Sequence, residues 1–416
     1  MNCGCAEVVT SGLLDLFEAR ERMVGAGRSV EGSERVALGD AEGRVLAEPV
    51  AAALDLPGVD NSAMDGYALR VAELGPEGLP VVQRVPAGAG VLHLPAGGCA
   101  RIFTGAPVPL GADAVVPQER VRLDAAGRVH VDGELPRGAN IRRRGEESRA
   151  GTSLLPAGTR LEAAAIALLA SHGIAEVTVR RRVKIALFST GDELIEPGAT
   201  RAPGQVFDSN RAMLKALMAR TGVEVLDLGV LLDDPLDLLQ ALSRARDEAD
   251  LVVCSGGVSV GEEDHVRPAI ERLGGIAFHG VGIKPGKPFA LGFLGESLAA
   301  GTPLVALPGN PVASLVGWQF LALPLLQARQ GMTPPALESF PVTAGFSRRG
   351  PRGRRELLRV VLDWSTGTPV ARLAGGQGSH MLSAASQAHG YLLVDADTDV
   401  EEGHAHGYCP AAQFGR

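Results

Sequence analysis

Residues 251–264 have the sequence LVVCSGGVSVGEED, a short apolar run followed by a polar loop. The apolar run Leu251–Cys254, with two β-branched valines at its centre, is typical of a buried strand. The adjacent glycines of Ser255-Gly256-Gly257 let backbone N–H groups approach an anion, because no Cβ stands in the way. Three acids, Glu262–Asp264, close the loop, and carboxylate oxygens are the ligands that hard divalent cations take. The loop is therefore either an anion-binding turn beside metal ligands or a flexible solvated turn.

Strands and helices alternate on both sides of this loop, which indicates a doubly wound parallel α/β domain over residues 183–332. Polar motifs follow nearly every expected strand. Ligands bind outside the carboxyl ends of strands in such sheets, so these loops are predicted to share one edge. The loops in question start at Ser189, Asp233, Ser255, Lys284 and Pro308.

The remaining chain is long enough for further domains, since 416 residues exceed one ordinary core. Residues 53–147 carry short alternating runs with Gly and Pro between them, which predicts a small inserted β-rich domain. Residues 1–52 and 148–182 are predicted to form an N-terminal helix and a connecting α+β domain. Residues 333–416 are predicted to form a C-terminal β-barrel-like domain. The fold class expected is thus multidomain α/β plus β.

The composition excludes several classes of protein. A hydrophobic content of 45% and a net charge of −8 are typical of a soluble globular chain and unsuited to tracking nucleic acid. We expect no membrane span and no signal peptide, because the apolar runs are short and the N-terminus lacks a basic region. Five cysteines form neither a disulfide framework nor a zinc pattern, so we expect a cytoplasmic protein.

Basic residues point to a phosphorylated ligand. Only four of the 40 basic residues are lysine, and two of these, Lys284 and Lys287, fall within one tetrapeptide. Lysines and backbone N–H groups suit phosphate, while clustered acids suit Mg²⁺ bridging phosphate oxygens. Neither a Walker motif nor a GxGxxG fingerprint is present. The residues alone therefore predict Mg²⁺-dependent handling of a nucleotide-like or phosphorylated ligand.

Three further motifs are ambiguous when taken singly. The stretch DNSAMDGYA at residues 60–68 offers acids or a local plug, and RIFTGAPVP at 101–109 offers a hydroxyl beside an N–H or a Pro-rich bend. The stretch GANIRRRGEE at 138–147 is a site or an exposed charged loop.

Taken together and in order, the motifs resemble those of the molybdopterin molybdenumtransferase family, to which the C-terminal region of gephyrin belongs. The resemblance spans roughly residues 8–410. It rests on the three motifs above and on STGDEL at 189, SGGVSVGEED at 255, IKPGKPFALG at 283 and LPGNPVAS at 307. It implies Mg²⁺-dependent insertion of molybdate into adenylylated molybdopterin with release of AMP. It also implies an α/β domain similar to molybdopterin adenylyltransferase, and a homodimer whose cleft lies between the α/β domain of one subunit and the DNSAMDGYA domain of the other.

The resemblance also assigns roles to residues. Catalytic roles are implied for Asp60, Thr104, Glu193 and Asp264. Substrate-binding roles are implied for Ser255, Gly256, Gly257, Lys284, Lys287, Pro308, Asn310, Pro311, Ser379 and Arg143. Metal ligation or water ordering is implied for Glu193, Asp233 or Asp234, Asp264 and Glu147.

Two positions depart from the family pattern, and two other functions stay open. Glu147 stands where the family usually has Asp, and His265 stands where an aromatic commonly follows the acid. A molybdopterin adenylyltransferase, which is also a possible partner of this chain, and a non-catalytic scaffold are the alternatives. The inserted domain argues against the first, and intact acids at Asp60, Glu193 and Asp264 argue against the second.

Overall fold

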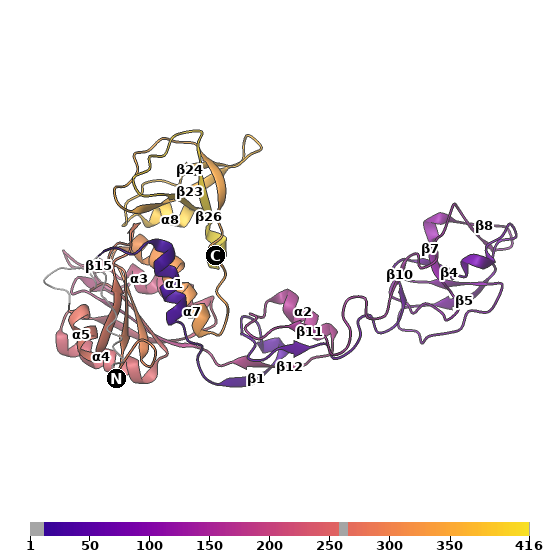
Figure 1. Ribbon diagram of the computed structural model, residues 1–416, viewed down its shortest axis with the longest axis horizontal. Coiled ribbons are helices and arrows are strands. Elements are labelled where there is room, and N and C mark those ends of the chain that lie inside the picture. The colour runs from indigo at the N-terminus through magenta and orange to yellow at the C-terminus, as the bar shows by residue number, and fades with distance from the viewer. Residues whose placement is uncertain (1–11, 258–264, 416) are drawn as a thin grey trace, which may run out of the picture.

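The structure, a computed structural model, describes residues 12–257 and 265–415 and is strongly elongated (Figure 1). The α/β domain and the C-terminal domain lie side by side at one end, and the inserted β-rich domain lies at the other. The connecting domain joins them through narrow two-chain links. The shape keeps the inserted domain far from the α/β domain of its own chain.

The α/β domain is built on a six-stranded sheet in the order β16-β13-β17-β21-β20-β18. Four of its strands are parallel to one another, as the sequence predicted. These are β13 (Lys184–Thr190), β16 (Glu224–Leu231), β17 (Leu251–Ser255) and β21 (Thr302–Leu307). The strand β20 (Ala290–Leu294) runs antiparallel to both β21 and β18 (Gly274–His279). The short connection from β18 to β20 accounts for this, because neighbouring parallel strands need a long crossover.

Helices cover both faces of this sheet, because successive strand side chains point to opposite sides. Ile185 and Leu187 of β13 belong to one buried cluster, whereas Ala186 and Phe188 belong to the other. The first face is covered by α1 (Leu16–Ala26), α3 (Ser209–Ala219) and the continuous helix formed by α6 (Pro311–Gly317), η4 (Trp318–Ala322) and α7 (Leu323–Arg329). The second face is covered by α4 (Pro235–Glu248) and α5 (Val266–Leu273).

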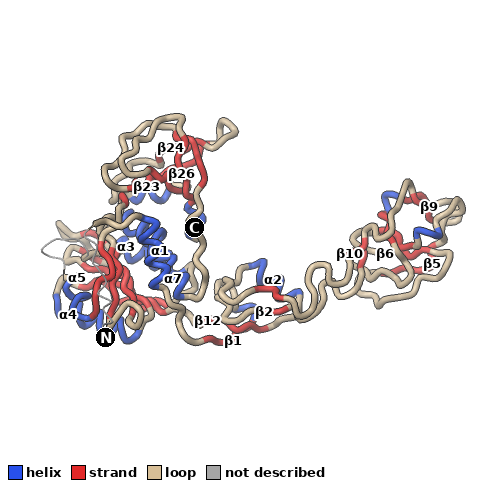
Figure 2. The backbone as a smooth tube through the Cα atoms, viewed as in Figure 1, coloured by secondary structure: helices blue, strands red, loops and turns tan. Residues whose placement is uncertain are grey.

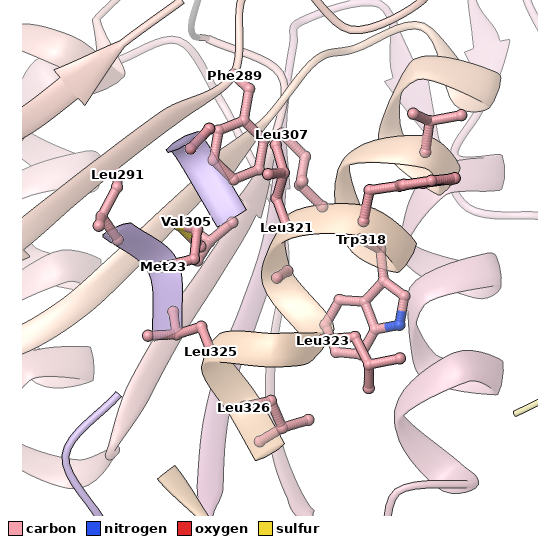
Figure 3. Close-up of a cluster of buried hydrophobic side chains, with 14 of the residues drawn as sticks. Met23, Phe289, Leu291, Val305, Leu307, Trp318, Leu321, Leu323, Leu325 and Leu326 are labelled. Atoms are coloured by element: carbon pink, nitrogen blue, oxygen red, sulfur yellow. The ribbon is translucent and has the colours of Figure 1, made fainter. Parts of the chain in front are cut away.

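The core of the first face contains the helix at 311–329, whose apolar side chains pack against the strands (Figure 3). Leu321 and Leu325 from this helix lie near Met23 of α1 and Val305 of β21. This helix is long and apolar enough to cross a membrane, yet 83% of its apolar window is buried inside the protein. Burial in a protein core explains that composition.

The connecting and inserted domains are built from short strands (Figure 2). In the connecting domain, β1 (Ser33–Ala37) pairs with β12 (Glu176–Arg180) and β2 (Val50–Ala51) pairs with β11 (Ser153–Leu155), beside α2 (Ala163–Ser171) and η1 (Leu38–Asp40). The inserted domain holds a sheet of β5 (Val81–Val85), β6 (Cys99–Ile102), β4 (Gly66–Leu69) and β7 (Ala114–Pro117). It also holds the pairs β8 (Val121–Leu123) with β9 (Val129–Val131) and β3 (Asn61–Ser62) with β10 (Ile141–Arg142), and the turns η2 (Val71–Glu73) and η3 (Gln118–Arg120).

The C-terminal domain is a closed barrel, as the sequence predicted, because β23 (Arg355–Asp363) pairs with both β24 (Val370–Leu373) and β25 (Gly390–Val394). The strands β22 (Phe340–Ala344) and β26 (Ala405–Pro410) complete it, with α8 (Leu382–Gln387) and η5 (Ala411–Phe414) alongside. The two-residue strand β19 (Ile283–Lys284) of the α/β domain pairs in parallel with β23. The barrel is therefore joined to the loop that carries both predicted lysines. One other small pair, β14 (Leu194–Ile195) with β15 (Val206–Phe207), lies in the α/β domain.

Candidate functional site

A cavity of about 700 Å³ opens at the carboxyl edge of the α/β sheet. Each of the five loops that the sequence placed on this edge contributes to it, together with the segment entering α3. The lining residues are Thr190, Gly191, Glu193, Leu194, Val206–Asn210, Asp233, Ser255–Gly257, Pro288 and Pro308–Pro311. The volume matches that of sites for cofactor-sized ligands.

The turn after β17 requires glycine at two consecutive positions. Gly256 and Gly257 adopt φ angles of 96° and 64°, a region that L residues rarely enter. A Cβ at Gly256 would meet the carbonyl oxygen of Thr190, and one at Gly257 would meet Val266. Only glycine fits both positions. The N–H of Gly256 donates to the carbonyl of Leu307 over 3.1 Å, so Gly257 is the residue of this turn whose N–H is a candidate donor to a ligand.

Three acidic residues, Glu193, Asp208 and Asp233, line the cavity, and Asp208 is already used as the cap of α3, where it accepts from the N–H of Arg211 over 3.0 Å. The hydroxyl of Thr190 donates to Asp233 Oδ1 over 2.5 Å, and the N–H of Asp233 donates to Asp192 Oδ1 over 3.1 Å. Asp234 has a different role. Its carboxylate caps α4 by accepting hydrogen bonds from the N–H groups of Leu236 (2.8 Å) and Asp237 (3.0 Å). Of the two aspartates that the sequence left open, Asp233 is thus the one facing the cavity.

Glu193 and Asp233 offer the oxygen donors that Mg²⁺ prefers, so the donor set fits this ion. Residues 12–257 and 265–415 contain no group of three or more His, Cys, Asp or Glu side chains arranged around one metal position. Asp264, which the sequence assigned to catalysis and to the metal, lies outside the described residues.

Neither predicted lysine lines the cavity. Lys284 Nζ lies 3.0 Å from Glu356 Oε1 in the barrel, and Glu356 also pairs with Arg348 at 3.1 Å. The backbone carbonyl of Lys287 accepts from the N–H of Val281, and the next residue along the chain, Pro288, reaches the cavity wall. The lysine loop therefore borders the cavity through its proline.

Ser379 lies near the opposite wall. Its carbonyl oxygen accepts the N–H of Val312 over 2.9 Å, beside the lining residues Asn310 and Pro311. The barrel thus touches the cavity region through this segment as well as through the lysine loop.

The acids of the inserted domain form a cluster of their own. Asp60 accepts from Arg143 Nη1 (2.7 Å) and from the N–H of Arg144 (2.8 Å). Partial burial acts to raise the pKa of Asp60, but these two hydrogen bonds outweigh it and the pKa is lowered. The N–H and hydroxyl of Thr104 both donate to Asp65 Oδ1 over 2.7 Å, and these bonds lower the pKa of Asp65.

The inserted domain, which contains these groups, and the α/β domain, which contains the cavity, lie at opposite ends of the molecule (Figure 1). Glu147 lies in the two-chain link between the connecting and inserted domains. Its N–H donates to the carbonyl of Leu56 over 3.0 Å, and the next residue, Ser148, contacts His172 of the connecting domain over 3.0 Å. The structure brings Asp60, Arg143 and Arg144 together, and it does not bring them to the cavity of the same chain.

Sequence reasoning missed several lining residues, among them Asn210 and Phe207. Asn210 donates from Nδ2 to Ser255 Oγ (2.6 Å) and to the carbonyl of Gly309 (2.7 Å), which ties three loops together. Phe207 lines the cavity with 43% of its surface exposed. The sequence feature that could have identified them is Asp208, which lies next to Phe207 and two residues before Asn210. Asp208 caps α3, and this places both residues at the edge of the cavity. A helix cap read from sequence does not reveal which loops lie opposite it.

Comparisons with known proteins cover nearly the whole chain. Residues 14–173 match the "MoeA N-terminal region (domain I and II)", residues 186–328 the "Probable molybdopterin binding domain", and residues 341–405 the "MoeA C-terminal region (domain IV)". A molybdopterin molybdenumtransferase of Haemophilus influenzae is 37% identical over 393 residues, covering 92% of this chain and 95% of that protein. One from Nostoc sp. is 42% identical over 303 residues, covering 70% of this chain and 69% of that protein.

Solved structures agree with the sequence matches. The crystal structure of the molybdopterin biosynthesis moeA protein from Pyrococcus horikoshii OT3 aligns with a TM-score of 0.78 and 27% identity. The alignment covers 96% of this chain and 100% of that one.

Proposed function

Because the chain belongs to the molybdopterin molybdenumtransferase family, we propose that it inserts molybdate into adenylylated molybdopterin and releases AMP. Membership of this family makes it a transferase of molybdenum cofactor biosynthesis. The observation that carries the finer proposal is the lining of the cavity, where a glycine turn, two carboxylates and an exposed aromatic ring face one space.

Each part of this lining suits one part of the proposed substrate. Gly257 and the first residues of α3, Ser209 and Asn210, offer N–H groups to phosphate oxygens, and Ser255 offers its hydroxyl. Phe207 and Val206, 43% and 45% exposed, offer an apolar surface to a flat heterocycle. The substrate combines phosphates with pterin and adenine rings, which is the chemistry this lining accepts.

Mg²⁺ is the proposed cofactor, held by Glu193 and Asp233 with Asp264 as a further candidate. Bound there, it would neutralise negative charge on the phosphates as the link to AMP is cleaved. The chain's own part is to fix the two carboxylates beside the phosphate turn, with the Thr190 hydroxyl holding Asp233 in place.

We propose that the active form is a homodimer with the site shared between subunits. The inserted domain, which holds Asp60, Thr104 and Arg143, lies at the far end of the elongated molecule, and Glu147 lies in the link that leads to it, so in this proposal a second copy brings them to the cavity. There they would close the site and help accept molybdate, a dianion. We place the reaction in the cytoplasm, without a nucleic-acid or membrane partner.

One incubation tests the proposal. Purified protein is mixed with adenylylated molybdopterin, Mg²⁺ and molybdate, and AMP release is followed together with incorporation of molybdenum. We expect both products in equal amounts. Turnover of molybdopterin with ATP instead would indicate an adenylyltransferase, and a folded protein inactive on either mixture would indicate a scaffold.

A further inference from the structure

Asn210 connects three separate elements beneath the cavity. It is the second residue of α3 and is 8% exposed. One side-chain amide group donates to Ser255 Oγ, at the end of β17, and to the carbonyl of Gly309, in the turn after β21. Because β17 and β21 are neighbouring strands in register at Ser255 and Leu307, the amide spans the two turns that form the cavity floor.

The hydrogen bonds around Asn210 have a fixed direction. Ser255 Oγ accepts from Asn210, so its own proton is available to donate. Ser314 Oγ lies 3.4 Å from Ser255 Oγ and donates its proton to the carbonyl of Pro308 over 2.7 Å. Ser314 must therefore be the acceptor in its contact with Ser255. The order is Asn210 to Ser255, Ser255 to Ser314, and Ser314 to Pro308.

The network engages two consecutive carbonyl groups. Pro308 accepts from Ser314, and Gly309 accepts from Asn210. The carbonyl oxygens of Pro308 and Gly309 therefore point toward the donor groups of Ser314 and Asn210. A carbonyl oxygen turned into the cavity would repel a phosphate by its partial negative charge, and the low dielectric of a partly enclosed site would strengthen that repulsion.

We propose that Asn210 is a positioning residue that locks the Ser255–Gly257 and Pro308–Pro311 turns together, so that they present N–H and O–H donors to the substrate phosphates. The proposal rests on the proposed function for the identity of the ligand. The hydrogen bond from Ser255 to Ser314 is long. A phosphate oxygen in the cavity can therefore replace Ser314 Oγ as the acceptor of the hydrogen bond from the Ser255 hydroxyl.

The test compares two variants at Asn210. Asn210→Ala removes both donors, and we expect KM for adenylylated molybdopterin to rise about tenfold while kcat changes less than about twofold. Asn210→Asp keeps the shape but sets a carboxylate against the Gly309 carbonyl and adds negative charge beside the phosphates. We expect its KM to rise about tenfold further.

Gln330→Ala is the matched control. Gln330 is 7% exposed, and its amide donates to the carbonyl of Thr221 over 2.7 Å, just beyond the other end of α3 and away from the cavity. This variant loses the same kind of buried bond in the same domain. We expect a fall in Tm comparable with that of Asn210→Ala and an unchanged KM.

Affinity for AMP, measured by titration calorimetry on the full-length protein, separates failure of the proposal from failure of the proposed function. AMP affinity that decreases from wild type to Asn210→Ala to Asn210→Asp supports the positioning role of Asn210. If this decrease is found but no turnover is seen, the proposed function alone fails. If wild type and Asn210→Ala bind AMP with equal affinity, the positioning role of Asn210 is overturned. The same follows if KM rises as much in Gln330→Ala as in Asn210→Ala. A wild-type protein that binds no AMP overturns both.

Discussion

The ammonium of Lys284 lies 3.0 Å from the carboxylate of Glu356, and the two residues are also paired in register between β19 and β23. Glu356 is 3% exposed and holds Arg348 as well. A residue of the α/β domain is therefore fixed by an acid of the barrel, four residues before Pro288 reaches the cavity wall. The barrel helps to set the shape of the site without lining most of it.

Neutralising that acid should weaken the junction between the two domains. Glu356→Gln leaves Lys284 and Arg348 without a counter-charge, and we expect a loss of about 1–3 kcal/mol in the free energy of unfolding, measured with urea. The control is Asp363→Asn on the same strand, whose pair with Arg372 is more exposed, so its loss should lower the free energy of unfolding by less. Equal losses would contradict a special role for Glu356.

Removing either acid of the proposed shared site should abolish turnover. We expect Asp60→Asn and Glu193→Ala to stop AMP release while size-exclusion chromatography still shows a folded dimer. Glu176→Ala, which breaks an exposed pair with Arg35 in the connecting domain, should retain full activity. Full turnover by either of the first two variants would count against its assigned role.

Mixing these two inactive variants tests whether the site is shared. A heterodimer would contain one site with both Glu193 and Asp60 intact and one site lacking both. Random exchange of subunits makes half of the dimers mixed, so we expect about a quarter of wild-type activity to return. Activity that stays absent after verified subunit exchange would place both residues in a site within one subunit.

Gly256 should be intolerant of a side chain for two reasons. Its φ of 96° is strained for alanine, and the added Cβ would meet the carbonyl of Thr190. Gly127→Ala is the matched control, because Gly127 has a φ of 75° with open space around its Cβ position. We expect about 1–2 kcal/mol of destabilisation in the control with unchanged KM, and a larger loss together with weakened AMP binding in Gly256→Ala. Equal AMP affinity in the two variants would show that the turn is not part of the site.

The lowered pKa of Asp60 predicts a pH dependence of stability. Because the carboxylate titrates lower in the folded protein than in the unfolded chain, its stabilising effect is present above about pH 4 and is lost as the pH falls through the folded-state pKa. Asp60→Asn should therefore be less stable than wild type at pH 7, and the difference should shrink below pH 4. A difference in urea midpoint that stays constant from pH 7 to pH 3 would contradict this.

Local patterns in the sequence were sufficient to predict most of the parallel strands of the α/β domain. The strand at 251–255 was predicted to within one residue, and the loops predicted to start at Ser189, Asp233 and Pro308 begin within two residues of the ends of β13, β16 and β21, because buried apolar runs and turn residues are local signals. The motifs after those strands also identified the family. The antiparallel direction of β20 was not predicted, since strand direction depends on the length of a connection whose ends are hard to place.

The sequence by itself determined the chemistry available to this protein: the glycine turn, the acids and the order of strands that places them on one edge. Only the tertiary structure decided which of them meet. It turned Asp233 toward the cavity while Asp234 capped a helix, gave Lys284 a partner in the barrel, and set Asn210 across two turns. It also separated Asp60 from the cavity of its own chain. These outcomes depend on contacts between residues distant in sequence, which no local periodicity or turn preference encodes.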